Sequence, residues 1–325
     1  MDNQESFESR VDLTKLKEGV EKIREQVGKV IVGQKQMVDL IITAVLADGH
    51  ILLEGVPGVA KTLAAKLVAK SMSVDFSRVQ FTPDLMPSDV LGTSVFNMKT
   101  SEFDFKKGPI FSNIVLIDEI NRAPAKTQSA LFEVMEERQV TVDGVTHKME
   151  PPYLVLATQN PIEQEGTYRL PEAQLDRFLF KIEIGYPSLD DEKEILLRAS
   201  NRKGEQMDEI TPVISAADIA AYKSTLSDII IDEKLLGYIA EIVNQTRSDQ
   251  SIYLGASPRA SLALLNGSRA FAAIQGRDFV TPEDIKFLAG PVLKHRIILT
   301  PEKEMEGISA AEVIQQLVAK TEVPR

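Results

Sequence analysis

The sequence predicts an α/β fold, a doubly wound and mostly parallel sheet, followed by an all-α domain. Two observations support this prediction. Four apolar runs alternate with helical segments in the first 187 residues, as strands of a buried parallel sheet do (51–53, 113–117, 153–158 and 179–184). Beyond them, apolar residues recur at helical spacing and we find no strand pattern. We therefore expect two domains, residues 1–187 and 188–325.

The first domain contains further elements. Residues 1–10 are expected to form a disordered tail. Apolar residues at spacings of three and four then predict an amphipathic helix, beginning near Leu13 and ending near Val27. Two hairpins are indicated by alternating apolar residues and by an Asp-Gly turn, at 95–105 and 140–149. The remaining predicted elements are helices at 34–47, 62–72 and 126–138 and a strand at 77–81.

The second domain shows repeated helix starts. Four segments have Ser or Thr followed three residues later by an acid, the pattern of a capping box (188–191, 215–218, 281–284 and 309–312). Two further helices are predicted at 232–247 and 258–274, and the linker between the domains at 185–188. The second domain is therefore expected to be helical throughout.

Composition limits the class of protein. Apolar residues make up 43 % and charged residues 26 % of the 325 residues, as in globular proteins. Cysteine is absent, which excludes disulfides and thiolate metal sites and favours a cytoplasmic location. The formal net charge of −11 argues against nonspecific nucleic-acid binding. There is no run of 18 apolar residues and no signal peptide, so no membrane association is expected.

The most informative stretch is a Gly-rich turn between an apolar strand and a helix. It contains Gly55, Val56, Pro57, Gly58, Val59 and Ala60, and the helix opens with Lys61, Thr62 and Leu63. This layout is typical of a phosphate-binding loop, in which backbone N–H groups at a helix N-terminus form an anion cradle. Lys61 would reach the phosphates and Thr62 would hold Mg²⁺. Ala60 departs from the usual Gly, and an ordinary strand-to-helix turn is the alternative.

A second group of candidates ends a predicted buried strand. Asp118 and Glu119 follow a run of apolar residues, and the carboxyl ends of strands in an open α/β sheet form the ligand crevice. Asp118 would orient Mg²⁺, and Glu119 would accept a proton from the attacking water. A strand that simply ends in solvent is the alternative. Asn160 follows the next buried strand and could hold the water, although Asn-Pro alone is a turn signal.

Two arginines complete the candidate set. Arg177 could act as an arginine finger in a neighbouring subunit's site, or it could pair with a nearby acid on the surface. Arg259 lies in the first turn of a predicted helix capped by Ser257, where a cation opposes the helix dipole. A γ-phosphate would offset that cost, and a structural carboxylate is the alternative.

Together these motifs resemble the AAA+ ATPases and, within them, the MoxR family. The matching stretches are 55–62, 116–123, 158–161, 170–178 and 255–259. The resemblance implies a P-loop AAA+ core with an all-α lid, in which Lys61 and Thr62 are the Walker A residues. It implies that Asp118 and Glu119 are Walker B, Asn160 sensor 1, Arg177 the finger and Arg259 sensor 2. The segment 31–34, which includes Val32 and Gly33, matches the part that packs near adenine. Arg169 stands where the family usually has Pro.

The resemblance also implies function. We expect an ATPase with ATP and Mg²⁺ as cofactors. It would form a homo-oligomeric ring, expected to be hexameric, that remodels or activates partner proteins. Von Willebrand factor A-domain proteins are among the expected clients, and the two hairpins match insertions that face the pore. A nucleic-acid-dependent motor is the alternative, with Lys99, Lys106 and Lys107 as the residues to watch. A nucleotide-dependent scaffold with little turnover is a third reading, which the intact Glu119 disfavours.

Overall fold

The computed structural model describes residues 11–56, 58–160, 167–201, 207 and 209–324. Its centre is a five-stranded sheet in which every pairing is parallel, in the order β2-β5-β8-β1-β9. The strands are β1 (His50–Gly55), β2 (Phe76–Gln80), β5 (Ile114–Asp118), β8 (Leu154–Gln159) and β9 (Phe178–Ile184). The prediction of a doubly wound, mostly parallel sheet is confirmed.

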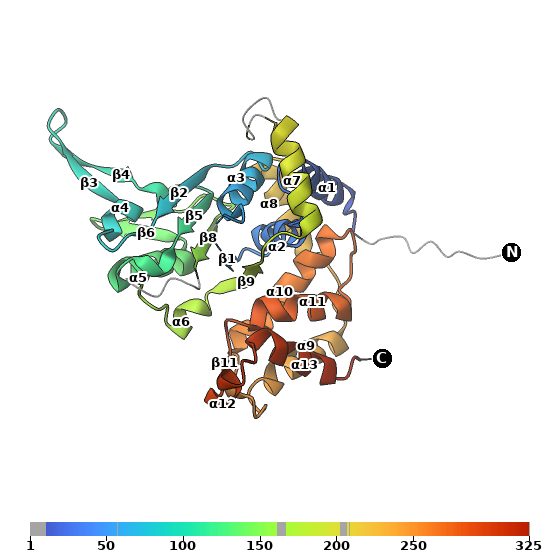
Figure 1. Ribbon diagram of the computed structural model, residues 1–325. Helices are drawn as coiled ribbons and strands as arrows, with labels where there is room; N and C mark the ends of the chain where they lie inside the picture. Colours follow the sequence, from blue (N-terminus) through green and yellow to red (C-terminus); the bar gives the residue numbers. More distant parts are fainter. Residues whose placement is uncertain (1–10, 57, 161–166, 202–206, 208, 325) are drawn as a thin grey trace.

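Helices cover both faces of this sheet (Figure 1). They are α1 (Thr14–Gly28), α2 (Lys35–Leu46), α3 (Lys61–Ser71), α4 (Pro87–Leu91), α5 (Ala125–Glu137) and α6 (Glu172–Leu175). Three short 3₁₀ turns also occur, η1 (Pro109–Phe111), η2 (Ile120–Arg122) and η3 (Leu226–Asp228). The expected helices at the start of the chain are therefore present, within one or two residues of their predicted ends.

Both predicted hairpins are present. The first is β3 (Gly92–Asn97) with β4 (Glu102–Lys107), and the second is β6 (Gln139–Val142) with β7 (Val145–Lys148). The β3–β4 hairpin extends away from the sheet (Figure 1). The two hairpins touch each other, because the Phe105 and His147 rings stack with centroids 4.4 Å apart.

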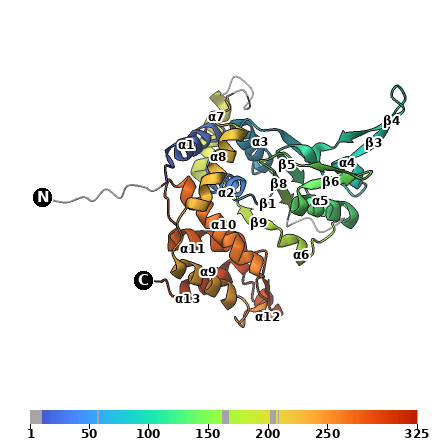
Figure 2. The same ribbon diagram turned by 180° about the vertical axis from the view of Figure 1, so that it is seen from behind.

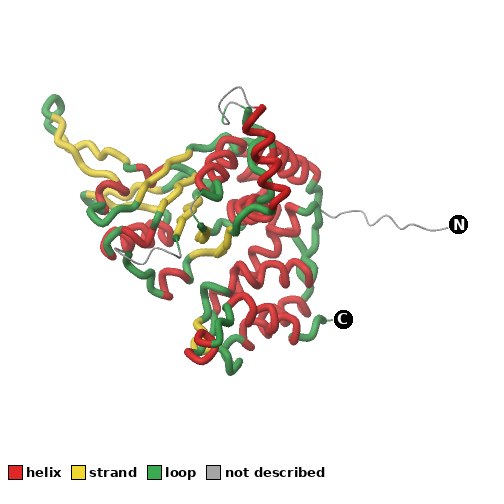
Figure 3. The backbone as a smooth tube through the Cα atoms, in the orientation of Figure 1, coloured by secondary structure: helices red, strands yellow, loops and turns green. Residues whose placement is uncertain are grey.

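The second half of the chain is mainly helical, and Figure 3 shows most of the strands gathered in the other part of the molecule. Its helices are α7 (Leu189–Asn201), α8 (Ala216–Thr225), α9 (Glu233–Gln245), α10 (Pro258–Ile274), α11 (Pro282–Leu293), α12 (Pro301–Met305) and α13 (Ala310–Lys320). It also contains a short antiparallel pair, β10 (Ile252–Leu254) with β11 (Ile298–Leu299), which we did not expect. Strands of three and two residues are too short to show an alternating pattern.

The predicted capping boxes are formed. Ser215 Oγ accepts a hydrogen bond from the backbone N–H of Asp218, and Ser309 Oγ accepts one from Glu312, both at 3.2 Å. The carboxylate of each acid accepts a hydrogen bond from the backbone N–H of its serine, at 2.8 and 2.7 Å. These reciprocal bonds satisfy N–H groups that a helix start leaves without partners, which is why the sequence located the starts correctly.

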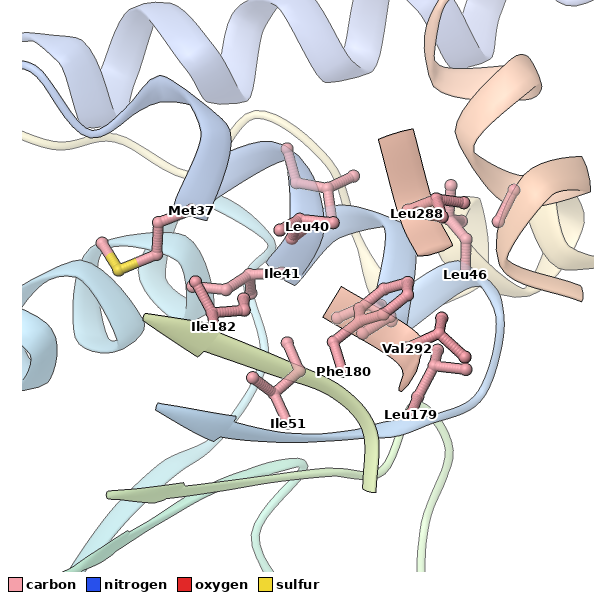
Figure 4. Close-up of a cluster of buried hydrophobic side chains, with 14 of the residues drawn as sticks. Met37, Leu40, Ile41, Leu46, Ile51, Leu179, Phe180, Ile182, Leu288 and Val292 are labelled. Atoms are coloured by element: carbon pink, nitrogen blue, oxygen red, sulfur yellow. The ribbon is translucent and has the colours of Figure 1, made fainter. Parts of the chain in front are cut away.

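One hydrophobic core joins the sheet to the helical part (Figure 4). Ile41 of α2 packs towards Ile51 and Ile182 of the sheet, while Leu288 and Val292 of α11 lie beside Phe180 on the same strand as Ile182. A fully buried side chain of this size contributes roughly 1.5–3 kcal/mol. The helical part is therefore packed directly on the sheet. None of the described helices is long and apolar enough to cross a membrane.

Candidate active site

The Gly-rich loop joins β1 to α3 at the carboxyl ends of the strands. Gly58 has a φ of +87°, which favours glycine, and Ala60 has a φ of +58°. A Cβ on Gly55 would lie 2.4 Å from the backbone oxygen of Ile184 in β9, so close strand packing also requires this glycine. Pro57, predicted to line the loop, lies outside the described residues. The described part of the loop thus combines two positive φ values with the start of a helix, as an anion cradle requires.

Lys61 is the first residue of α3 and lies across this loop. Its Nζ donates a hydrogen bond to the backbone oxygen of Gly55 at 2.6 Å. Partial burial lowers the pKa of Lys61, and the nearby carboxylates of Asp118, Glu119 and Glu54 oppose that shift. The ammonium therefore sits between the loop and the acidic end of β5, where it can exchange its carbonyl partner for a phosphate oxygen.

Asp118 is the last residue of β5, so it too lies at the carboxyl ends of the strands. Its Oδ1 accepts a 2.6 Å hydrogen bond from the Thr158 hydroxyl of β8, and its Oδ2 lies 2.6 Å from Nη2 of Arg78 in β2. The Asp118 carboxylate is thus already paired with the Arg78 guanidinium. Mg²⁺ binds hard oxygen ligands such as this carboxylate and the Thr62 hydroxyl. The described residues contain no cluster of three acidic, His or Cys side chains able to hold a metal. This donor set fits a cation that takes its other ligands from phosphates and water.

Glu119 is held in a strained position beside Asp118. Its φ is +57°, a left-handed conformation that is costly for a residue with a side chain. Its backbone N–H donates to the Thr158 hydroxyl at 2.9 Å, and its Oε2 accepts from Gln80 Nε2 at 2.9 Å. Arg122 Nε lies 3.1 Å from the same oxygen. Gln80 and Arg122 therefore hold the carboxylate that we predicted to be catalytic, and Thr158 holds the backbone of the same residue.

Asn160 directly follows β8, which pairs with β5 through Ile117 and Ala157. It therefore lies at the edge of the sheet where Asp118 and Glu119 also lie, as its position after a buried strand predicted.

A cavity of about 330 Å³ lies next to the loop. It is lined by Val32, Gly33 and Gln34, by the chain after β9 (Gly185–Pro187) and by Gly290 and Pro291 of α11. Gln34 Nε2 donates to the backbone oxygen of Val59 at 2.8 Å, which links this wall to the loop. The position of this cavity next to the loop suits the base of a nucleotide. Val32 and Gly33 line the cavity, as the resemblance implied.

The two candidate arginines lie together at the opposite end of the strands. Arg259 Nη2 is 2.9 Å from Oε1 of Glu136 in α5, and Arg177 Nε is 3.9 Å from Oε2 of the same carboxylate. Arg177 Nη1 also donates to the backbone oxygen of Phe132 at 2.6 Å. Arg259 does lie in the first turn of α10, as predicted, but its anionic partner here is the structural carboxylate.

Strand register shows how far these arginines are from the loop. In the pairing of β1 with β9, His50 lies opposite Phe178 and Gly55 opposite Ile184. Arg177 therefore precedes the first pair, and the loop follows the last. At 3.3 Å per residue, these two pairs are about 17 Å apart along the strands. The structure brings Lys61, Asp118, Glu119 and Asn160 together, and it holds Arg177 and Arg259 apart from them.

Sequence reasoning missed four residues of this site. Gln80 and Thr158 lie at the ends of β2 and β8, so the rule that selected Asp118 could have found them. Arg78 lies within β2 and Arg122 in η2, and no sequence pattern marks either as a partner of the acids.

Comparisons with known proteins agree with this geometry. Residues 50–180 match the profile of the ATPase family associated with various cellular activities (AAA), and residues 244–317 match the AAA lid domain. The chain is 48 % identical to the uncharacterized protein YeaC of Bacillus subtilis, covering 92 % of this chain and 93 % of that protein. It is 43 % identical to chaperone MoxR1 of Mycobacterium tuberculosis, covering 92 % of this chain and 81 % of that one.

A solved structure is similar along nearly the whole chain. It is that of a protein from Cytophaga hutchinsonii provisionally described as an ATPase, with a TM-score of 0.89 and 44 % identity over 96 % of this chain and 97 % of the other. The chain therefore belongs to the AAA ATPases, and within them to the MoxR family of chaperone-type proteins.

Proposed function

We propose that this chain is a cytoplasmic, Mg²⁺-dependent ATP hydrolase that works as a ring, hexameric by family resemblance, and that remodels or activates partner proteins. The division of the site carries the proposal. The phosphate loop and the two acids lie at the carboxyl ends of the strands, whereas Arg177 and Arg259 lie at the amino ends. Each arginine pair would then serve the site of the next subunit.

Within one subunit, the loop N–H groups and Lys61 would bind the phosphates. Thr62 and Asp118 would hold Mg²⁺, which supplies charge neutralisation at the phosphates when bound. Asn160 would hold the attacking water, and Glu119 would accept its proton. Gln80 and Arg122 keep the Glu119 carboxylate in place.

The arginines would act in trans. Charge that develops on the transferred phosphoryl group is stabilised by guanidinium groups, and such groups are commonly supplied by a neighbour. Glu136 keeps Arg177 and Arg259 side by side, so both would enter the same neighbouring site. This differs from the simplest expectation for Arg259, a contact with the γ-phosphate of its own chain.

The β3–β4 hairpin is the proposed contact with client proteins. Phe96, Met98 and Phe103 are exposed on it, and Phe96 and Phe103 pack edge to face with centroids 5.3 Å apart. Its charge is mixed, since Glu102 and Asp104 lie between Lys99 and the adjacent Lys106 and Lys107. An apolar surface of mixed charge favours protein segments over nucleic acid. Von Willebrand factor A-domain proteins remain the client class to test.

Two variants test the ATPase assignment. Lys61→Ala removes a charge-assisted contact to phosphate and should weaken nucleotide binding about 10–100-fold in a fluorescent ATP titration. Glu119→Gln should leave binding intact but lower the hydrolysis rate by a factor of about 100 or more. Lys66, exposed on the same helix, provides a matched control, because Lys66→Ala should change neither property. Unchanged affinity in Lys61→Ala would refute the assignment, and turnover stimulated by DNA would favour the nucleic-acid motor instead.

A further inference from the structure

Helix α7 has its polarity reversed relative to an ordinary surface helix. None of its residues is buried, and the side chains that are half covered by the rest of the protein are polar: Asp191, Glu194 and Arg198. Its leucines face solvent instead, with exposed fractions of 70 % for Leu189, 70 % for Leu196 and 58 % for Leu197. A surface helix normally turns its apolar stripe towards the core.

Specific hydrogen bonds fix this orientation. Arg198 Nη1 donates to the backbone oxygens of Gly28 and Lys29, at 2.7 and 3.1 Å, and Arg198 Nε lies 2.7 Å from Glu194. Asp191 lies so close to Gly33 that a Cβ there would be 2.7 Å from its carboxylate. The outward position of the leucines is therefore determined by the polar side. We call Leu189, Leu196 and Leu197 the α7 apolar face.

A second set of exposed apolar side chains lies close to Arg259 along the chain. Tyr253 and Leu254 of β10 are exposed, by 76 % and 48 %, and Leu262 of α10 is exposed by 59 %. Leu262 is three residues after Arg259, so the two side chains share one side of the helix. We call Tyr253, Leu254 and Leu262, with Arg259, the arginine face.

These two surfaces lie at opposite ends of the molecule. Figure 1 and Figure 2 both show α7 at the end where α1 and α3 lie, and β11, which pairs with β10, at the other end with α12. Different surfaces at opposite ends of one chain allow a head-to-tail contact that can close into a ring. A two-fold dimer would have to match one of these surfaces with itself.

We propose that the α7 apolar face docks onto the arginine face of a second copy of this chain. This deepens the proposed function and rests on it. A copy that brings Arg177 and Arg259 to the phosphate loop brings Leu262 and Tyr253 with them. The loop is close to α7, because Asp191 contacts Gly33 and the adjacent Gln34 donates to Val59. The same approach therefore buries both apolar surfaces and completes the site.

The first test measures assembly. Leu196→Glu combined with Leu197→Glu, placed in the Glu119→Gln chain with ATP, should remain monomeric by sedimentation velocity, while the Glu119→Gln parent assembles. Leu236→Glu is the matched control, since it places the same charge on an exposed apolar residue of α9. Circular dichroism and the melting temperature should be unchanged, because these leucines bury little surface in the monomer.

The second test identifies the partner surface. The chain contains no cysteine, so single cysteines can be introduced without background. Leu196→Cys mixed with Leu262→Cys and ATP should give a cross-linked dimer with a short bismaleimide. Leu196→Cys alone should give none, nor should Leu196→Cys with Met98→Cys.

The outcomes separate this proposal from the ATPase assignment. Assembly of the Leu196→Glu, Leu197→Glu chain to the parent's extent would overturn the docking surface, even if the wild-type chain binds and hydrolyses ATP. A cross-link between two Leu196→Cys chains, or a wild-type chain that hydrolyses ATP as a monomer, would also overturn it. Failure of the wild-type chain to bind ATP would refute the ATPase assignment itself.

Discussion

At the scale of single residues, the site depends on a side chain, Thr158, to which the sequence analysis gave no role. The Thr158 hydroxyl donates to Asp118 and accepts the backbone N–H of Glu119, and it is buried. It therefore determines where both acids point, while a residue in the left-handed region, Glu119, needs such support to keep its conformation. Thr158 therefore positions both the proposed metal ligand, Asp118, and the proposed base, Glu119.

Replacing Thr158 by Val tests this role. The two side chains have nearly the same shape, but valine leaves the Glu119 N–H and the Asp118 carboxylate without this partner. We expect kcat to fall about 10–100-fold, with a much smaller change in KM for ATP. Thr146→Val, on the exposed β6–β7 hairpin, is the control and should behave as wild type. A change in KM alone would argue against positioning.

Prediction from the sequence succeeded at this scale where chemistry follows strand ends. Lys61 was selected from the Gly-rich turn before a helix, and Asp118 and Asn160 because the carboxyl ends of parallel strands gather ligands; the structure places all three at that end of the sheet. Prediction was incomplete for Arg259: the helix start at Ser257 was right, but the partner depends on where α10 lies relative to α5. Glu136 is 123 residues away in the chain, and no local pattern can reveal that contact.

At the scale of elements, His50 joins three of them. It begins β1, its Nδ1 accepts the backbone N–H of Val155 in β8 at 3.0 Å, and its Nε2 lies 3.0 Å from the backbone oxygen of Met135 in α5. Because Nδ1 accepts, Nε2 carries the proton and donates. The ring is therefore neutral in the fold. Burial lowers the pKa of His50 to about 4, and the Arg138 charge adds to this.

This shift predicts a pH dependence of stability. The unfolded chain binds a proton at His50 below its ordinary pKa of 6.5, whereas the folded chain resists protonation until about pH 4. Stability should thus fall as the pH drops through this window, by about 1.4 kcal/mol per unit and about 3 kcal/mol in all from this group. Urea unfolding between pH 7 and 4 measures it. His50→Asn should show a smaller slope, and an equal slope would contradict the assignment.

Helix α7 shows what element-level prediction cannot supply. Its start at Ser188 was predicted from the capping pattern, and Ser188 and Asp191 do form reciprocal bonds. An amphipathic pattern alone does not say which side faces the protein. The polar side turns inward because Arg198 donates to the backbone oxygens of Gly28 and Lys29, and such contacts between distant parts of the sequence exist only in the folded chain.

At the scale of the whole molecule, the helical part is tied to the strand that follows Arg177. Asp176 accepts hydrogen bonds from Ser257 Oγ at 2.8 Å and from Arg296 Nε at 2.8 Å, and Arg296 also donates to backbone oxygens of β9. Arg177 and Arg259 are thus carried on one rigid arrangement, held by the residues beside them. Gly290 and Pro291 of α11 also line the cavity proposed for the nucleotide base, so a movement of α11 would displace both arginines together.

The central claim is that one subunit's arginines complete the site of another, and mixing two inactive variants tests it most directly. The Arg259→Ala subunit lacks one of the arginines supplied to the neighbouring site but has an intact phosphate loop. The Lys61→Ala subunit lacks the loop lysine but has both arginines. Combined in equal amounts, they should regain up to about a quarter of wild-type ATP turnover, because in a randomly mixed ring a quarter of the sites pair an intact loop with an intact donor. No recovery above the separate variants would contradict the claim.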